Sequence, residues 1–124
     1  PVVNEPELIT RLGQRGFQAV SLENCSFLEQ VAIFRDARCV VAAHGAGLAN
    51  LAFARDAAVL ELFSADYLRP DCYFTLQRVT GRAYDCWLDA RSAGPTKPWG
   101  EMAADIHAIE NKIDRLLDQG GGAR

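Results

Sequence analysis

Short apolar runs alternate with helical patterns along most of this sequence, and this alternation restricts the fold more than any other feature. The spacing of apolar residues predicts helices at residues 4–16, 27–37, 48–54 and 71–80. Runs typical of strands lie between and after them, at residues 17–22, 38–43, 58–63 and 82–88. Strands and helices that alternate at such distances favour a parallel sheet joined by right-handed crossovers. We therefore expect an α/β fold with a sheet of about four strands flanked by helices.

Local signals mark several of these boundaries. Asn4 with Glu7 has the spacing of an N-cap and its capping-box partner, and Ser26 with Glu29 repeats that spacing. The strand at 38–43, RCVVAA, has apolar residues on both faces, which is typical of an interior strand of a parallel sheet.

The last third of the chain contains a loop and one amphipathic helix. Residues 92–100, SAGPTKPWG, have the composition of a linker that ends a domain at 1–91. A single apolar stripe follows, made of Ile106, Ile109, Ile113, Leu116 and Leu117. It predicts a helix within residues 101–119 that docks on the same domain, because about two heptads are too few for a coiled coil. Residues 120–124, GGGAR, are expected to be a disordered tail.

Composition excludes several classes of protein. A net charge of −3 gives no overall attraction to nucleic acid. The four cysteines form neither a CxxC pair nor a zinc-spaced cluster, so buried free thiols are favoured, with structural disulfides left open. No apolar stretch approaches the roughly 20 residues that cross a bilayer, and no signal peptide is visible. These features favour a reducing, cytoplasmic environment.

The stretch VVAAHGAGLANLAF, residues 40–53, places a histidine and two glycines at the end of a predicted strand. Glycine permits a sharp turn there and lets a ligand approach the backbone. The helix that follows directs free N–H groups toward the loop, which suits a diphosphate. His44 adds a hydrogen-bond donor to such a site. The alternative is a tight turn in which His44 is only structural.

Two known glycine-rich loops fit this stretch poorly. In the dinucleotide fingerprint G-x-G-x-x-G, the third glycine is replaced by Asn50. The HGGG oxyanion loop of lipases requires a serine on a G-x-S-x-G turn. None of the four serines (Ser21, Ser26, Ser64 and Ser92) has glycines at that spacing. A nicotinamide site and a serine hydrolase are therefore both disfavoured.

From Asn4 to about Leu88, the sequence resembles the C-terminal, donor-binding part of glycosyltransferase family 61. The resemblance is carried by the segments NEPEL, GFQAVSLE, SFLEQV, ARCVV, HGAGLAN and VLELF. The further stretch YFTLQRVTGRAYDCWL is similar to the aromatic helix, the glycine and the last strand of that family. HGAGLAN after SFLEQ is far more specific than either segment alone.

This resemblance implies a Rossmann-like domain, the C-terminal half of a GT-B architecture. It implies an enzyme that transfers a sugar from a nucleotide-sugar to a glycan hydroxyl, with inversion and without a metal or other cofactor. The absence of a D-x-D motif agrees with that expectation, because basic groups and a helix N-terminus can stabilise the leaving diphosphate. Bacterial members are described as capsular polysaccharide biosynthesis proteins, so we expect the bacterial cytoplasm.

The family's site residues carry over to matching positions of this sequence. His44 is the expected catalytic group at the leaving diphosphate. The expected donor-binding residues are Gly45, Ala46, Gly47, Leu48, Asn50, Glu61 and Glu23. Cleft residues that suit a sugar or base are Tyr67, Arg69 and Tyr73. Glu61 has the alternative of a buried structural carboxylate, and Gln30 is expected to support the fold or the glycine loop.

Family members also have a basic strand before the NEPEL helix and an acceptor-binding N-terminal domain, and this sequence begins after both. The resemblance thus implies a fragment that is inactive alone. Its expected partners are the nucleotide-sugar, the glycan acceptor and the missing N-terminal domain, through which the enzyme could associate with a membrane; a homodimer is left open. The alternative is a nucleotide-binding or scaffold module without transferase activity.

Overall fold

The computed structural model describes residues 2–43, 46–64, 83–89 and 101–121, without the side chains of 46–49 and 119–121. Several expected features lie outside these residues: the helix at 71–80, the linker at 92–100, and the site residues His44, Gly45, Tyr67, Arg69 and Tyr73.

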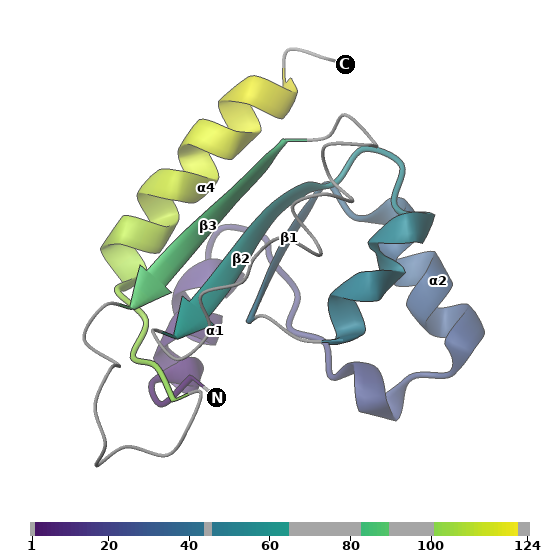
Figure 1. The fold of residues 1–124 in the computed structure, drawn as a ribbon, viewed down its shortest axis with the longest axis horizontal. Coiled ribbons are helices and arrows are strands. Elements are labelled where there is room, and N and C mark those ends of the chain that lie inside the picture. Colours follow the sequence, from purple (N-terminus) through teal and green to yellow (C-terminus); the bar gives the residue numbers. More distant parts are fainter. Residues whose placement is uncertain (1, 44–45, 65–82, 90–100, 122–124) are drawn as a thin grey trace.

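Among the described residues, three parallel strands form one sheet in the order β1 (Cys39–Ala43), β2 (Ala58–Ser64) and β3 (Tyr84–Asp89). The α-helices are α1 (Glu5–Gly13), α2 (Phe27–Asp36) and α4 (Ile106–Gly121), and the 3₁₀ helices are η1 (Leu22–Asn24) and η2 (Ala46–Phe53) (Figure 1). An α/β fold with a parallel sheet flanked by helices is confirmed for the described part of the chain.

Helices cover both faces of the sheet. Alternate residues of β2 point to opposite faces, so each face contributes to its own apolar cluster. On one face, Leu60 packs with side chains of α1 and α4, among them Leu8 and Ile109. On the other face, Val59 packs with Phe34 of α2 and Leu51 of η2. All seven residues of β2 are buried, whereas all five residues of β1 are only half-buried. The centre of the core therefore lies at β2.

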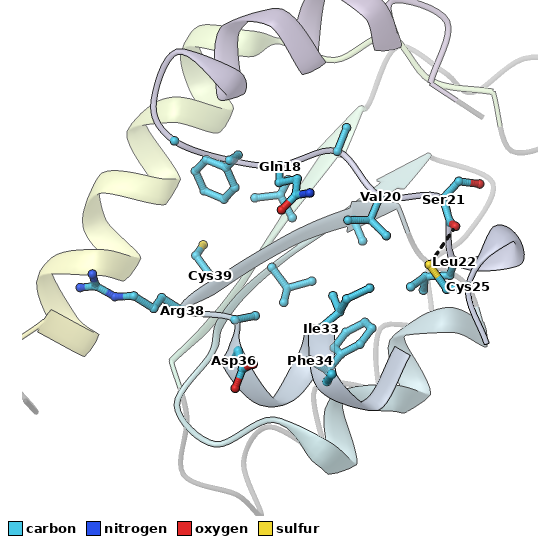
Figure 2. A pocket seen from close by; sticks show the side chains of 18 of the residues that line it. Gln18, Val20, Ser21, Leu22, Cys25, Ile33, Phe34, Asp36, Arg38 and Cys39 are labelled. Atoms are coloured by element: carbon cyan, nitrogen blue, oxygen red, sulfur yellow. Dashed lines mark hydrogen bonds between the residues drawn. The ribbon is translucent and has the colours of Figure 1, made fainter. Parts of the chain in front are cut away.

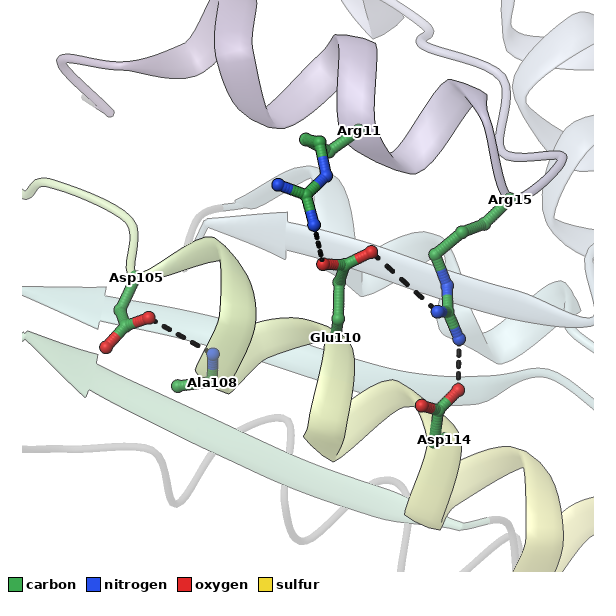
Figure 3. Close-up of polar contacts among 6 residues, drawn as sticks. All are labelled: Arg11, Arg15, Asp105, Ala108, Glu110 and Asp114. Atoms are coloured by element: carbon green, nitrogen blue, oxygen red, sulfur yellow. Dashed lines mark hydrogen bonds and ion pairs between the residues drawn. The ribbon is translucent and has the colours of Figure 1, made fainter.

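The helix α4 packs on the face that α1 covers, and charged pairs join the two helices (Figure 3). Arg11 lies 2.6 Å from Glu110, and Arg15 pairs with both Glu110 and Asp114. Asp105 caps the start of α4 by accepting a hydrogen bond from the Ala108 N–H at 3.1 Å. This cap places the helix start at Ile106, later than the start of the range 101–119 within which the helix was expected.

Of the two expected capping boxes, the first is wrong. Asn4 makes no side-chain cap on α1. Instead, Asn4 Nδ2 donates to the Ala104 carbonyl at 2.9 Å, and Asn4 Oδ1 accepts from the Ala104 N–H at 2.8 Å. This long-range pair satisfies both polar groups of the Asn4 side chain, so neither caps α1. The second capping box is confirmed, since Ser26 and Glu29 exchange both of its hydrogen bonds.

The expected strand at 17–22 forms no ladder with the sheet. Residues 17–21 have no regular secondary structure and pair with no strand of the described chain, Ser21 has an extended backbone, and Leu22 begins η1. The expected interior strand, β1, accordingly lies at the edge of the three-stranded sheet. The expected helix at 48–54 is a 3₁₀ helix that already begins at Ala46.

Candidate functional site

The glycine loop follows the carboxyl end of β1, and the sheet places two polar residues at the same edge. Ser64 ends β2 and pairs in register with Asp89, which ends β3. Ser64 is 1% exposed, and its hydroxyl has no hydrogen-bond partner among the described residues. Asp89 accepts a hydrogen bond from the Ala103 N–H at 2.9 Å. In open α/β sheets, ligands bind at this edge.

Asn50 is joined to α2 by a side-chain hydrogen bond. Its Nδ2 donates to Oε1 of Gln30 at 2.7 Å. The amide of Gln30 in turn donates to the carbonyl oxygens of Leu22 and Cys25, at 3.0 and 3.3 Å. This half-buried chain of hydrogen bonds ties η2, which leads out of the glycine loop, to α2 and η1. The arrangement fixes the position of η2 beside the carboxyl edge.

Glu61 is fully buried in the middle strand. Its Oε1 accepts a hydrogen bond from the Tyr84 hydroxyl at 2.6 Å. Both side chains belong to the face that α2 and η2 cover, since Glu61 lies two residues after Val59 and Tyr84 packs with that cluster. Burial and the bond to Glu61 raise the pKa of Tyr84 above its usual value, so the phenol stays protonated and donates.

Sequence reasoning did not identify Tyr84 or Ser64 as members of this region. A tyrosine at the start of a predicted strand gives no indication of its partner, because the partner depends on strand register. Ser64 was considered only as a nucleophile. Ser64 directly follows the apolar run of the predicted strand at 58–63. That position could have indicated a polar residue at the carboxyl end of a strand, where ligands bind.

The other expected site residues are placed only in part. Glu23 lies in η1, is exposed, and accepts a hydrogen bond from the Ser21 hydroxyl at 3.4 Å. Ala46, Gly47 and Leu48 lie in η2, with side chains outside the described ones. The structure therefore brings Asn50 to Gln30 and Glu61 to Tyr84, but it joins neither pair to Glu23.

The described cysteines are free thiols: Cys25, Cys39 and Cys86. Burial raises the pKa of Cys39 to about 11, so this thiol is unreactive at neutral pH. Within the described ranges, no three metal-ligating side chains gather at one point, and the expectation of metal independence stays a prediction. No helix in that part of the chain has the length and apolar character of a membrane span.

Residues 1–60 match the family model described as Glycosyltransferase 61. The match includes α1, α2, β1 and the whole glycine loop.

Two kinds of animal protein are similar to this chain. It is 37% identical over 90 residues, 69% of its length, to the EGF domain-specific O-linked N-acetylglucosamine transferase of Drosophila melanogaster. It is 32% identical over 130 aligned residues, 93% of its length, to protein O-linked-mannose beta-1,4-N-acetylglucosaminyltransferase 2 of Xenopus tropicalis. The chain spans only 17% and 22% of these relatives.

These relatives correct the expected location. A bacterial cytoplasmic protein was expected from the thiols and from the bacterial members of the family, and this expectation is wrong. The similar proteins come from animals and are named for EGF domains and O-linked mannose of proteins. EGF domains are disulfide-dense modules of secreted proteins.

Proposed function

We propose that this chain, whose residues 1–60 match the family model of glycosyltransferase family 61, is a piece of a glycosyltransferase and forms part of the donor-binding half of the enzyme. The donor is a nucleotide-sugar, and the acceptor is a hydroxyl of a protein-linked glycan. The observation that carries the proposal is the family match across β1 and the glycine loop, at the edge of the sheet where ligands bind.

The transferred sugar in this proposal is N-acetylglucosamine. Support comes from the relatives, because both kinds are named as transferases of that sugar although their named acceptors differ. A shared donor with different acceptors agrees with a donor site on this domain and an acceptor site elsewhere in the protein. The second half of a GT-B enzyme would supply that acceptor site and the catalytic base.

The proposed reaction is a single inverting displacement. The acceptor hydroxyl attacks the anomeric carbon, the bond from that carbon to the diphosphate breaks, and the nucleotide leaves with the electron pair. Negative charge then develops on the diphosphate, and the proposal assigns its stabilisation to His44 and to the backbone N–H groups of Gly45 and Gly47. Such donors stabilise the charge without a metal ion. The isolated chain would bind donor without completing transfer.

The glycine loop can be tested in the full-length protein labelled with ¹⁵N-glycine. During titration with UDP, GDP and CMP, the amide signals of Gly45 and Gly47 should move with one nucleotide. Gly13 and Gly16, at the far end of α1, serve as controls that should not move. No movement of the loop signals with any nucleotide would refute the donor site. In a further titration with NAD, movement of the Gly45 and Gly47 signals would favour another kind of nucleotide-binding enzyme. Binding of a nucleotide by a full-length protein that transfers no sugar would favour a non-catalytic module.

A further inference from the structure

The tripeptide Asn24-Cys25-Ser26 has the pattern N-x-S/T without a proline in the middle, which is the acceptor pattern of asparagine-linked glycosylation. The other three asparagines have neither serine nor threonine two residues later: Asn4, Asn50 and Asn111. A pattern this short also occurs by chance, so its place in the fold decides whether a glycan can be attached. A usable acceptor lies on a surface loop.

Asn24 lies on the surface, in the turn that leads from residues 17–21 into α2. It is the last residue of η1, and it is exposed. Figure 2 shows this turn at one end of a pocket, with the hydrogen bond from the Cys25 thiol to the Ser21 carbonyl as a dashed line. Cys25 has an extended backbone, and so does Ser26. The acceptor pattern therefore occupies a surface turn that opens into extended chain.

The side-chain amide of Asn24 is not engaged. Within the part of the chain that the structure describes, no hydrogen bond holds this amide. Asn4 differs, because its amide pairs with the backbone of Ala104. Asn50 also differs, because its amide donates to Gln30. A sugar attached to the Asn24 nitrogen therefore breaks no contact of the described fold.

The surface around Asn24 leaves room for a glycan. Glu23 is exposed on one side in the sequence, and Phe27 and Leu28, at the start of α2, are 63% and 77% exposed on the other. Successive side chains of a 3₁₀ helix diverge by about 120°, so a glycan on Asn24 points away from Glu23. The neighbours in sequence thus leave the surface at Asn24 open.

The turn that carries Asn24 is held by its neighbours. The Gln30 amide donates to the carbonyls of Leu22 and Cys25 at 3.0 and 3.3 Å, on either side of Asn24. The Ser26 hydroxyl caps α2 by accepting a backbone hydrogen bond at 3.1 Å. Glycosylation precedes this cap in time, because asparagine-linked glycans are added while the chain is still extended. The cap therefore does not compete with the use of Ser26 in the acceptor pattern.

The inference rests on the proposed function in one respect, the compartment. Asparagine-linked glycans are added inside the secretory pathway. One kind of relative is named for EGF domains, which are disulfide-dense modules of secreted proteins. An enzyme that modifies the glycans of such proteins meets them in that pathway.

We propose that Asn24 carries an asparagine-linked glycan in the complete protein. The donor is an oligosaccharide joined to a lipid through a diphosphate, and the reaction is catalysed by the oligosaccharyltransferase of the cell. The side-chain nitrogen of Asn24 attacks the anomeric carbon of the first sugar and loses one proton to a base of that enzyme. The bond from the anomeric carbon to the diphosphate breaks, and the lipid diphosphate leaves with the electron pair.

The test is the occupancy of Asn24 in the full-length protein made in eukaryotic cells. Trypsin cuts after Arg15 and Arg35, and the peptide between them, residues 16–35, contains Asn24 as its only asparagine. Release of the glycan by peptide N-glycosidase F in ¹⁸O water converts a modified asparagine to ¹⁸O-labelled aspartate. The labelled peptide should be the main form in the mass spectrum. A peptide without the label would overturn the proposal.

Two variants of Ser26 test the acceptor pattern. Ser26→Ala keeps Asn24 but removes the pattern, so the label should be lost. Ser26→Thr is the matched control, because threonine preserves the pattern and can also cap α2, so the label should remain. A label that survives in Ser26→Ala, or disappears in Ser26→Thr, would contradict glycosylation through this pattern.

A C-terminal reporter domain with its own glycosylated asparagine shows whether the protein reaches the compartment. A labelled reporter beside an unlabelled Asn24 would overturn this proposal and leave the donor site untouched. An unlabelled reporter would place the protein outside the compartment and would overturn it as well. Conversely, a labelled Asn24 with no response of Gly45 and Gly47 to nucleotides would refute only the donor site.

Discussion

The Tyr84 hydroxyl donates a hydrogen bond of 2.6 Å to the carboxylate of Glu61, which is fully buried in the middle strand of the sheet. The two residues are far apart in sequence and meet only because β3 pairs with β2. The bond joins these two strands on the face that α2 and η2 cover, so its loss should weaken the sheet.

Tyr84→Phe should lower the free energy of unfolding by about 1–3 kcal/mol, because a buried carboxylate loses a donor. Urea unfolding of the chain at pH 7 measures this loss. The control is the same substitution in a Glu61→Gln background, where the acceptor is neutral and the lost hydrogen bond is weaker. Equal losses in the two backgrounds would contradict the role of the Glu61 carboxylate.

Alkaline pH should destabilise the chain through the same residue. The pKa of Tyr84 is raised in the folded state by burial and by Glu61, whereas in the unfolded chain it is the usual value of about 10. Above that pH the unfolded state binds fewer protons than the folded state, so stability falls as pH rises. The slope is at most about 1.4 kcal/mol per pH unit, and less for a half-buried group. Unfolding midpoints from pH 8 to 11 should fall more steeply for the wild type than for Tyr84→Phe.

The hydrogen bond from Asn50 to Gln30 should couple the two residues energetically. Asn50→Ala and Gln30→Ala should each cost about 1 kcal/mol of unfolding free energy. The double variant should cost less than the sum, with a coupling of about 0.5–1.5 kcal/mol. Strict additivity in urea unfolding would show that the bond at 2.7 Å adds nothing to stability.

Two glycines at the end of α1 should respond to alanine in opposite directions. A Cβ at either Gly13 or Gly16 meets no atom within 4 Å. Gly13 is helical, so Gly13→Ala should stabilise by about 0.5–1 kcal/mol. Gly16 has φ +90°, so Gly16→Ala should cost about 1–2 kcal/mol. Thermal unfolding of both variants checks the sign of each change. A higher melting temperature for Gly16→Ala would contradict the left-handed conformation of Gly16.

Apolar contact rather than charge should hold α4 on the sheet. Ile113 is fully buried, so Ile113→Ala should cost about 2–5 kcal/mol. Arg11→Ala removes a partly exposed ion pair and should cost less than about 1 kcal/mol. Urea unfolding of the two variants compares their losses of unfolding free energy. A larger loss for Arg11→Ala than for Ile113→Ala would contradict this account.

In the full-length enzyme, His44→Ala should reduce kcat by about 10²-fold or more, because a group that stabilises the leaving diphosphate is lost. The melting temperature should change little. His107→Ala, on the exposed side of α4, is the matched control and should leave kcat unchanged. Parallel loss of activity and melting temperature at His44 would indicate a structural histidine.

Much of the fold was predictable from local spacing. Apolar periodicity placed α1, α2, β1 and β2 within a few residues of their observed bounds, and the alternation of elements predicted the parallel sheet. Ser26 and Glu29 formed the predicted cap because both partners lie within one turn. Signals of this kind depend on neighbours in sequence, which the sequence displays directly.

Only the tertiary structure decided the contacts between distant residues. Asn4 has the spacing of a helix cap, but a partner 100 residues away, Ala104, takes both of its amide groups. Glu61 reads as an isolated acid in an apolar strand until strand register brings Tyr84 to it. The sequence by itself determined the positions of α1, α2, β1 and β2, because these elements follow local periodicity. Which strand lies at the edge, and which buried polar groups meet, depended on how the elements pack, and no local pattern encodes that arrangement.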